Sequence, residues 1–206
     1  MQATPEINDA IVQLTMKKGL KGLTMDLVAR ELGMSKRTLY EIYGSKTDML
    51  HTIFDYTHKK HIARCDILFA TSPNVMVGIL RVYNGIRDQI ARMNPSFFRD
   101  MDEFFADSRS QYEELEDKRH LHFMEMFKIG VKEGVFRPDV NFIVQSKMLH
   151  VQMEALKRME QIFPQEFTLL DVYDSIIISF LRSIASPKGM EILDGIRSSS
   201  SQQSKI

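Results

Sequence analysis

Apolar residues recur at helical spacing along almost the whole chain, and no segment sustains the apolar–polar alternation that a half-buried strand requires. The spacing therefore predicts an all-α fold of about nine helices. Their approximate ranges are 6–18, 24–32, 35–43, 45–69, 73 onward, 95 onward, 108–133, 140–162 and 168–186.

Several predicted helix starts are marked by local chemistry. Serine or asparagine followed by proline, at 72–73 and 94–95, is expected to begin two helices, because proline suits the first helical position. Thr168 and Asp171 form a possible capping box, in which each side chain bonds the other residue's backbone N–H. These signals place helix starts more firmly than periodicity alone.

Residues 24–46 contain two short helices joined by a glycine turn. Thr24 is suited to cap the first helix, and Gly33 stands where that helix must end, a position that favours a residue able to take positive φ. Ser35 is suited to cap the second helix, whose apolar residues follow i, i+3, i+4 spacing. This is the pattern of a helix-turn-helix, in which the start of the second helix enters the DNA major groove.

The outward residues of the second helix are basic or carry hydroxyl groups. Arg37 and the neighbouring Lys36 are expected to approach base edges, because such donors recognise guanine. The other polar groups near the helix starts suit phosphate oxygens. The predicted DNA-contacting residues are Thr24, Ser35, Lys36, Arg37, Thr38, Tyr40 and Lys46.

The distribution of charge agrees with a DNA-binding segment. The whole chain has a net charge of zero, but residues 16–46 hold seven bases against three acids, a balance of +4, so the remainder holds −4. A basic footprint on an otherwise acidic molecule limits nonspecific attraction to phosphate. Charge alone would equally fit the solvated face of an ordinary helical domain.

The spacing A-x-x-x-G-x-S-K-x-T-L-Y-x-x-Y-x-S-K closely resembles the DNA-binding domain of the TetR/AcrR family of bacterial repressors. It is carried by Ala29, Gly33, Ser35, Lys36, Thr38, Leu39, Tyr40, Tyr43, Ser45 and Lys46, and the likeness covers about the first 65 residues. The resemblance implies that Tyr43 packs its ring inside. Ile42 stands where many members carry His or Tyr on a phosphate, and it is expected to pack inward.

The resemblance also implies a two-domain layout. Residues 1–46 are expected to form the helix-turn-helix domain, which extends through the start of the next helix to about residue 65. Residues 47–197 are expected to form a helical ligand-binding and dimerisation domain. Residues 198–206 lack apolar content and are predicted to be a disordered tail.

The segment 168–186 is apolar nearly all round, and such a helix must be covered on both sides. Paired with 140–162, it could form a four-helix bundle with a second copy of the chain, which is how the family dimerises. Burial inside a single subunit is the alternative. The residues predicted at the dimer interface are Leu149, Met153, Ile177, Phe180, Leu181 and Ile184.

Phenylalanine and methionine are concentrated between residues 97 and 127. Such stripes are usually core, but flexible thioethers also suit a pliable apolar pocket. The resemblance favours a pocket for an apolar or amphipathic small-molecule effector. The candidate pocket residues are Phe54, His61, Cys65, Met101, Phe104, Phe105, Tyr112, Phe123, Phe127 and Met153.

Metal, cofactor and catalytic chemistry are not predicted. His58, His61 and Cys65 share one side of a predicted helix, but three ligands on one helix do not easily surround a tetrahedral ion. Asp117 and His120 form a single D-x-x-H turn without the second copy that a dinuclear site needs. No phosphate loop, dinucleotide fingerprint, nucleophile elbow or HExxH motif is present.

The rest of the composition favours a cytoplasmic protein. No run of 18 apolar residues exists, the first ten residues are not those of a secretory signal, and one cysteine cannot form an intrachain disulfide. The sequence thus predicts a ligand-responsive regulator, a repressor that binds a near-palindromic operator on double-stranded DNA as a homodimer. The alternatives are a helical small-molecule-binding protein or enzyme with an incidental basic motif, and a protein-binding adaptor.

Overall fold

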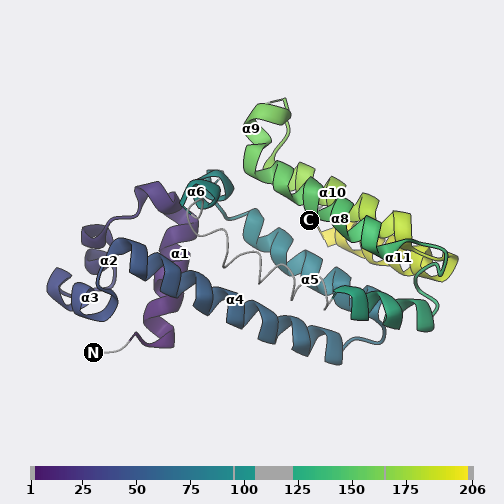
Figure 1. Cartoon of the computed structure of the whole chain (residues 1–206), viewed down its shortest axis with the longest axis horizontal. Coiled ribbons are helices and arrows are strands. Elements are labelled where there is room, and N and C mark those ends of the chain that lie inside the picture. Colours follow the sequence, from purple (N-terminus) through teal and green to yellow (C-terminus); the bar gives the residue numbers. More distant parts are fainter. Residues whose placement is uncertain (1–2, 95, 105–122, 165, 204–206) are drawn as a thin grey trace. The chain divides into compact units, whose positions relative to one another are not determined.

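The computed structural model describes residues 3–94, 96–104, 123–164 and 166–203 (Figure 1). The chain divides into two units. The N-terminal unit comprises Met1–Asp66 and Arg92–Phe104, and the C-terminal unit comprises Ile67–Ala91 and Phe105–Ile206. The predicted all-α fold with an N-terminal helix-turn-helix is confirmed.

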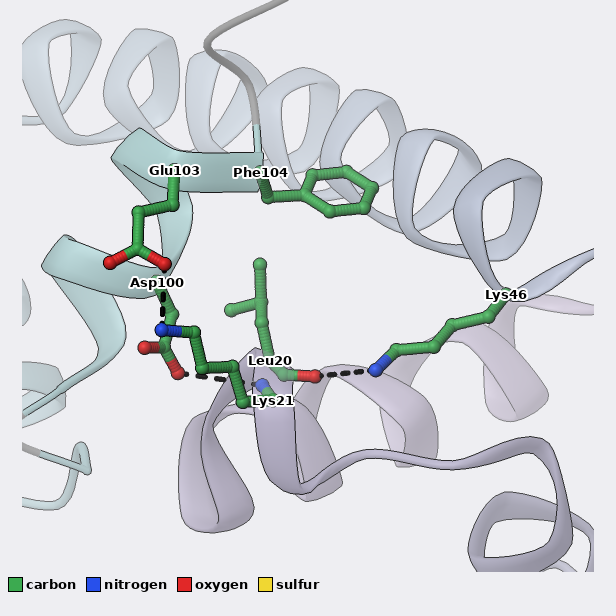
Figure 2. Close-up of a pocket in the computed structure, with 6 residues that line it drawn as sticks. All are labelled: Leu20, Lys21, Lys46, Asp100, Glu103 and Phe104. Atoms are coloured by element: carbon green, nitrogen blue, oxygen red, sulfur yellow. Dashed lines mark hydrogen bonds and ion pairs between the residues drawn. The ribbon is translucent and has the colours of Figure 1, made fainter.

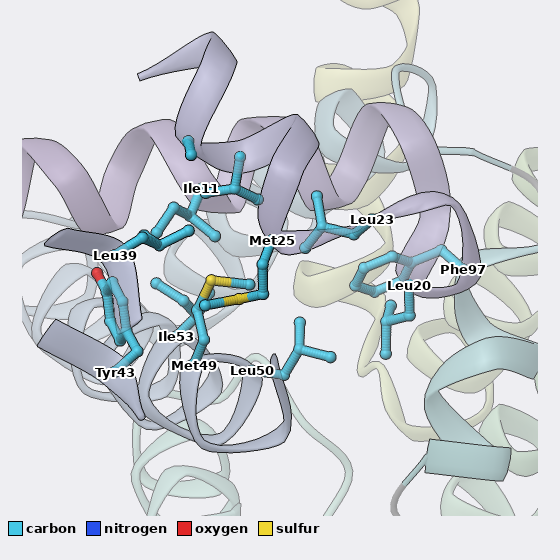
Figure 3. Close-up of a cluster of buried hydrophobic side chains, with 12 residues drawn as sticks. Ile11, Leu20, Leu23, Met25, Leu39, Tyr43, Met49, Leu50, Ile53 and Phe97 are labelled. Carbon is cyan, nitrogen blue, oxygen red and sulfur yellow. The ribbon is translucent and has the colours of Figure 1, made fainter. Parts of the chain in front are cut away.

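The N-terminal unit is built from helices around one apolar core. Its helices are α1 (Pro5–Gly22), α2 (Met25–Glu31), α3 (Lys36–Tyr43), α4 (Lys46–Ala70), of which residues up to Asp66 belong to this unit, and α6 (Phe97–Phe104). Figure 3 shows the core, where Ile11, Leu39 and Met49 are fully buried. Phe97 of α6 lies in the same cluster, so α6 packs with the helix-turn-helix.

A glycine bends α1 near its C-terminal end. Gly19 has φ 73° and ψ 164°, a conformation that residues with a side chain rarely adopt. A Cβ at this position would lie 3.1 Å from Asp100 Oδ2 and 3.2 Å from Ser96 Oγ. Asn94 N donates to the Met16 carbonyl oxygen (2.8 Å), which the bend frees from its intrahelical partner. The bend therefore makes room for the segment that leads into α6.

The C-terminal unit is helical around a core rich in phenylalanine. Its named elements are α5 (Val75–Ile90), α8 (Phe142–Ala155), the 3₁₀ turn η2 (Leu156–Arg158), α9 (Met159–Ile162), α10 (Leu169–Ile184) and α11 (Pro187–Gln203), and residues 123–132 are also helical. In Figure 1, α8 and α10 run side by side. Asp174 joins α10 to α5, because it accepts hydrogen bonds from the Tyr83 hydroxyl (2.7 Å) and Arg87 Nε (3.0 Å).

Three sequence-based boundaries are corrected by the structure. The helix expected from 72–73 begins at Val75, because Asn74 caps Val77 N while the Ser72 hydroxyl donates to the Leu68 carbonyl and ends α4. The helix expected over 140–162 is interrupted by η2, where Leu156 is buried. Residues 198–203, predicted to be disordered, continue α11, because they contain neither glycine nor proline to stop a helix that begins at Pro187.

One further expectation is confirmed, and two others fall at least partly on residues outside the described ranges. The capping box of Thr168 and Asp171 is confirmed at the start of α10. The helix predicted over 108–133 is described only from residue 123 onward, and the D-x-x-H turn of Asp117 and His120 lies outside the described residues. Within the described ranges, no helix is both long enough and apolar enough to cross a membrane.

Candidate nucleic-acid interface

The helix-turn-helix is held by the local contacts that the sequence predicts. The Thr24 hydroxyl accepts a hydrogen bond from Leu27 N (3.1 Å), and the Ser35 hydroxyl accepts one from Thr38 N (3.0 Å). Gly33 between the two helices has φ 63°. Each cap satisfies an N–H group that its own helix cannot pair. The turn between the helices is closed by Met34 N, which donates to the Ala29 carbonyl oxygen (3.0 Å).

One side of α3 is anchored in the core of the N-terminal unit. Leu39 is fully buried and Tyr43 is 6% exposed. The Tyr43 hydroxyl donates to Asn8 Oδ1 of α1 (2.7 Å), and burial raises the pKa of Tyr43 to about 12. Ile42 is partly buried against the same core. The predicted inward packing of both Ile42 and Tyr43 is therefore confirmed.

The other side of α3 faces solvent. Lys36, Arg37 and Tyr40 are exposed, and Tyr40 keeps 43% of its surface accessible. Thr38 is half-buried, and its hydroxyl lies 2.8 Å from Ser35 Oγ. The structure thus places five of the predicted DNA-contacting residues on or beside the exposed start of α3, with Thr24 exposed at the start of α2.

Two acidic side chains hold the basic residues of α3, and sequence reasoning missed both. Asp26 binds Lys36 Nζ through both oxygens, at 2.8 and 3.1 Å, and this hydrogen bonding raises the pKa of Lys36. Glu41 accepts from Arg37 Nε at 2.9 Å. The i, i+4 spacing of Arg37 and Glu41 could have indicated the second pair from sequence alone.

Lys46 departs from the expected phosphate contact. Its ammonium donates to the Leu20 carbonyl oxygen at the end of α1 (2.8 Å), and burial lowers its pKa. The physical reason is the bend at Gly19. The Leu20 carbonyl comes directly after the bend, has no full turn of helix after it, and accepts a side-chain donor instead of a backbone N–H. An internal partner for Lys46 is at odds with its assignment to the DNA surface.

Lys46 also lines a cavity of about 220 Å³ in the N-terminal unit (Figure 2). On the opposite side, Glu103 pairs with Lys21 Nζ (2.6 Å), and Asp100 Oδ2 accepts from Lys21 N (3.4 Å). Asp100 is 3% exposed, and its Oδ1 has no hydrogen-bond partner among the described residues. These contacts fasten α6 to the end of α1.

The candidate effector residues are divided between the two units and the residues outside the described ranges. Phe104 lines the cavity and lies 5.5 Å from the His51 ring, while Phe54 and Met101 pack against the N-terminal core. Cys65 Sγ lies 3.5 Å from His61 Nε2, and burial raises the pKa of this thiol.

The remaining candidates lie in the C-terminal unit or outside the described residues. Phe127 lies in the core of the C-terminal unit, where it is 1% exposed and its ring centroid lies 4.7 Å from that of Phe142. Phe123 and Met153 are half-buried. Phe105 and Tyr112 lie outside the described residues.

The predicted dimer residues require a larger correction. Phe180, Leu181 and Ile184 are buried in the core of their own C-terminal unit, at 7%, 0% and 0% exposure, so they are not available to a second subunit. Leu149, Met153 and Ile177 are half-buried. The all-round apolar character of 168–186 is instead satisfied within the chain, because helices α5 and α8 both pack against α10.

Exposed apolar surface lies on α8 instead. Ile143, Val144, Met148 and Val151 are 48–67% exposed and fall on one side of that helix. In the described ranges, no group of three or more His, Cys, Asp or Glu residues is placed to hold a metal ion.

Comparisons with known proteins agree with this architecture. The sequence profile of the bacterial regulatory proteins of the tetR family matches residues 7–53. No match to the chain was found among curated proteins.

Several solved structures share the fold at low sequence identity. A TetR-family transcriptional regulator from Marinobacter aquaeolei VT8 matches with a TM-score of 0.66 and 17% identity, over 97% of this chain and 98% of that one. A transcriptional regulator from Saccharomonospora viridis, solved with choline, matches with a TM-score of 0.62 and 17% identity, over 87% and 96%. FadR from Bacillus subtilis, solved with stearoyl-CoA, matches with a TM-score of 0.57 and 15% identity, over 85% and 96%.

The fold and the site together define an all-helical DNA-binding protein, with a helix-turn-helix in its N-terminal unit and a second helical unit after it. Residues 7–53 are identified as the DNA-binding domain of the tetR family of bacterial regulatory proteins, and the chain shares the fold of TetR-family transcriptional regulators. The identification made from the motif is confirmed.

Proposed function

We propose that this regulator is a repressor that binds a near-palindromic operator as a homodimer and is released by a small apolar or amphipathic effector. The exposed face of α3 carries the proposal. It presents Arg37 and Tyr40 to solvent, while Leu39 and Tyr43 on the other side fix the helix in the core. A rigid helix with a donor-rich outer face is suited to reading base edges in the major groove.

A second subunit is proposed because one such DNA-binding module buries little surface against DNA. The exposed apolar face of α8, formed by Ile143, Val144, Met148 and Val151, is the surface that supports a dimer. Self-association through one face gives two-fold symmetry, which is the closed symmetry commonest among soluble oligomers. Two α3 helices related in this way suit two half-sites one helical turn apart, about 34 Å.

The effector is proposed by analogy with regulators of the same fold. One of them was solved with choline and another with stearoyl-CoA, both of which join a polar group to apolar carbon. An effector that displaced α4 would disturb the bond from Lys46, the first residue of that helix, to Leu20 of α1. The resulting change in DNA affinity is expected to match a typical coupling free energy of about 1–3 kcal/mol.

The proposal is tested by selecting bound sequences from random duplex DNA with the full-length protein. The expected result is an inverted repeat whose binding weakens steeply with salt, together with sedimentation as a dimer. Enrichment of no sequence would overturn DNA recognition, and enrichment of an isolated half-site by a monomer would overturn the dimer.

The repressor and effector roles are tested separately with the selected operator. A reporter gene placed behind it should fall in expression when the regulator is present, and choline or a long-chain acyl-CoA should be tried for release of the operator. Increased expression would identify an activator. Unchanged operator affinity with both compounds would exclude these two ligand chemistries.

A further inference from the structure

Arg37 and Glu41 are the outermost residues of the recognition helix α3. The buried side of that helix is marked by Leu39 and Tyr43, and at 3.6 residues per turn the positions opposite them are 37 and 41. Their side chains are 88% and 53% exposed. A major groove that receives α3 therefore meets this pair before any other side chain of the helix.

The contact between the two side chains leaves most of their hydrogen-bonding capacity unused. Arg37 Nε donates to Glu41 Oε1 at 2.9 Å. A guanidinium has five N–H donors, so the four on its two terminal nitrogens can donate to another partner in a fixed fork. The second carboxylate oxygen of Glu41 can likewise accept from a donor beside that partner.

Lys36 is placed differently, although it is also basic and exposed. Both carboxylate oxygens of Asp26, on α2, bind its ammonium. This arrangement ties Lys36 back to the neighbouring helix. Arg37 and Glu41, which stand on the same helix and project from its outer side, are the better placed base-reading group.

An acidic residue at the centre of a DNA-facing surface needs a specific partner, because the phosphates around it repel a carboxylate. The amino group at N4 of cytosine is the donor in the major groove that acidic side chains accept from. Guanine presents two acceptors, N7 and O6, next to that amino group. The row of two acceptors and one donor on a G·C pair is complementary to the donors of Arg37 and the acceptor of Glu41.

We propose that Arg37 and Glu41 act as one unit that reads a single G·C base pair in each half-site of the operator. Arg37 donates to guanine N7 and O6, and Glu41 accepts from cytosine N4 while its bond to Nε keeps the guanidinium in position. Glu41 is thus a specificity-determining residue. The assignment rests on the proposed function, since it requires α3 to enter a major groove.

The test repeats the selection from random duplex DNA with Glu41→Ala, Arg37→Ala and the double variant, beside the wild type. Each single variant should lose preference at the same G·C position by at least about fivefold, the lower end of what a bidentate contact contributes. The double variant should lose no more than either single variant, because both side chains serve one interaction. Both positions are more than half exposed, so thermal unfolding should be unchanged.

Glu31→Ala is the matched control. It removes one exposed carboxylate from α2, where Glu31 lies 3.6 Å from Arg30, and should select the wild-type sequence. Tighter binding of Glu41→Ala to all sequences with an unchanged motif would show that Glu41 acts only as a charge and overturn the inference. Losses at two different base pairs would overturn the joint reading. A wild type that selects no sequence would instead overturn the proposed function itself.

Discussion

The N-terminal and C-terminal units are both helical, but different interactions fix their helices. In the N-terminal unit, a buried hydrogen bond from Tyr43 to Asn8 and capped helix starts supplement an aliphatic and methionine core. In the C-terminal unit, the core centres on Phe127, whose ring lies 4.7 Å from that of Phe142 and 6.1 Å from that of Phe180. Both units have capped helix starts and side-chain hydrogen bonds between helices, but the bond from Tyr43 to Asn8 is buried within the first core, whereas the bonds from Tyr83 and Arg87 to Asp174 are only partly buried beside a core of stacked rings.

This difference relates to what each unit is proposed to do. Buried hydrogen bonds have strict geometry and specify one arrangement, which a helix that reads bases must have. Apolar cores tolerate repacking when their total volume is kept, so they lose uniqueness before they lose stability. Such a core suits a unit that must adjust to an effector. Mutations in the two units should consequently differ in which property they change and in the size of that change.

The largest effect is expected in the aromatic core of the C-terminal unit. Phe127→Ala should lower the free energy of unfolding by about 3–5 kcal/mol, because it leaves a cavity where a 1% exposed ring stood. Ile129→Ala is the control two residues away; that side chain is 49% exposed, and the change should stay within about 0.5 kcal/mol. Denaturant unfolding measures both. Equal losses in the two variants would contradict this account of the core.

The next largest effect is expected for the exposed face of α8. A combined Met148→Glu and Val151→Glu variant should sediment as a folded monomer, because each carboxylate would have to enter an apolar interface unpaired, at a cost of about 3–5 kcal/mol. Ile162→Glu in α9, also about half exposed, should remain dimeric. A dimeric double variant that still binds operator would show that the subunits meet elsewhere.

A smaller effect is expected from the buried hydrogen bond of the N-terminal unit. Tyr43→Phe should destabilise the protein by about 1–3 kcal/mol, because Asn8 Oδ1 would remain buried without its donor. Tyr40→Phe removes a hydroxyl from a residue that is 43% exposed, and its unfolding curve should match that of the wild type. If both variants were equally stable, the bond from Tyr43 would contribute nothing net.

The same residue gives a pH-dependent prediction. Burial raises the pKa of Tyr43 to about 12, above the ordinary value of about 10. The unfolded chain then loses this proton first as the pH rises, so the stability that the neutral phenol contributes is complete below pH 10 and is lost towards pH 12. The difference in unfolding free energy between wild type and Tyr43→Phe should therefore shrink above pH 10. A constant difference from pH 8 to 12 would contradict the buried, neutral phenol.

The features that sequence predicted well are those that depend on neighbours in the chain. Thr24, Gly33 and Ser35 take the cap and turn conformations expected of them, because caps and turns are determined within a few residues. The capping box at Thr168 is local in the same sense. Helix existence and the helix-turn-helix follow from such signals.

The features that sequence missed depend on contacts between distant residues. Asp100 bonds the backbone of Lys21, 79 positions away, and no periodicity marks that pair. A wide apolar face on α10 is compatible with burial by a second subunit or by the same chain. Phe180 is buried by its own chain. Only the packing of α10 against α5 and α8 resolves that choice.

The smallest expected effect separates a lysine that supports the fold from one that faces DNA. Lys46→Ala should lower the free energy of unfolding by about 1 kcal/mol, because the Leu20 carbonyl loses a donor, and should leave the salt dependence of operator binding unchanged. Lys36→Ala, at an exposed position, should leave stability unchanged and weaken operator binding. Lys46→Ala could instead leave stability intact and reduce the slope of log affinity against log salt concentration by about one. That result would mean that Lys46 leaves Leu20 for a phosphate when DNA binds. Its position at the start of α4 would then make it part of the interface, as the motif first suggested.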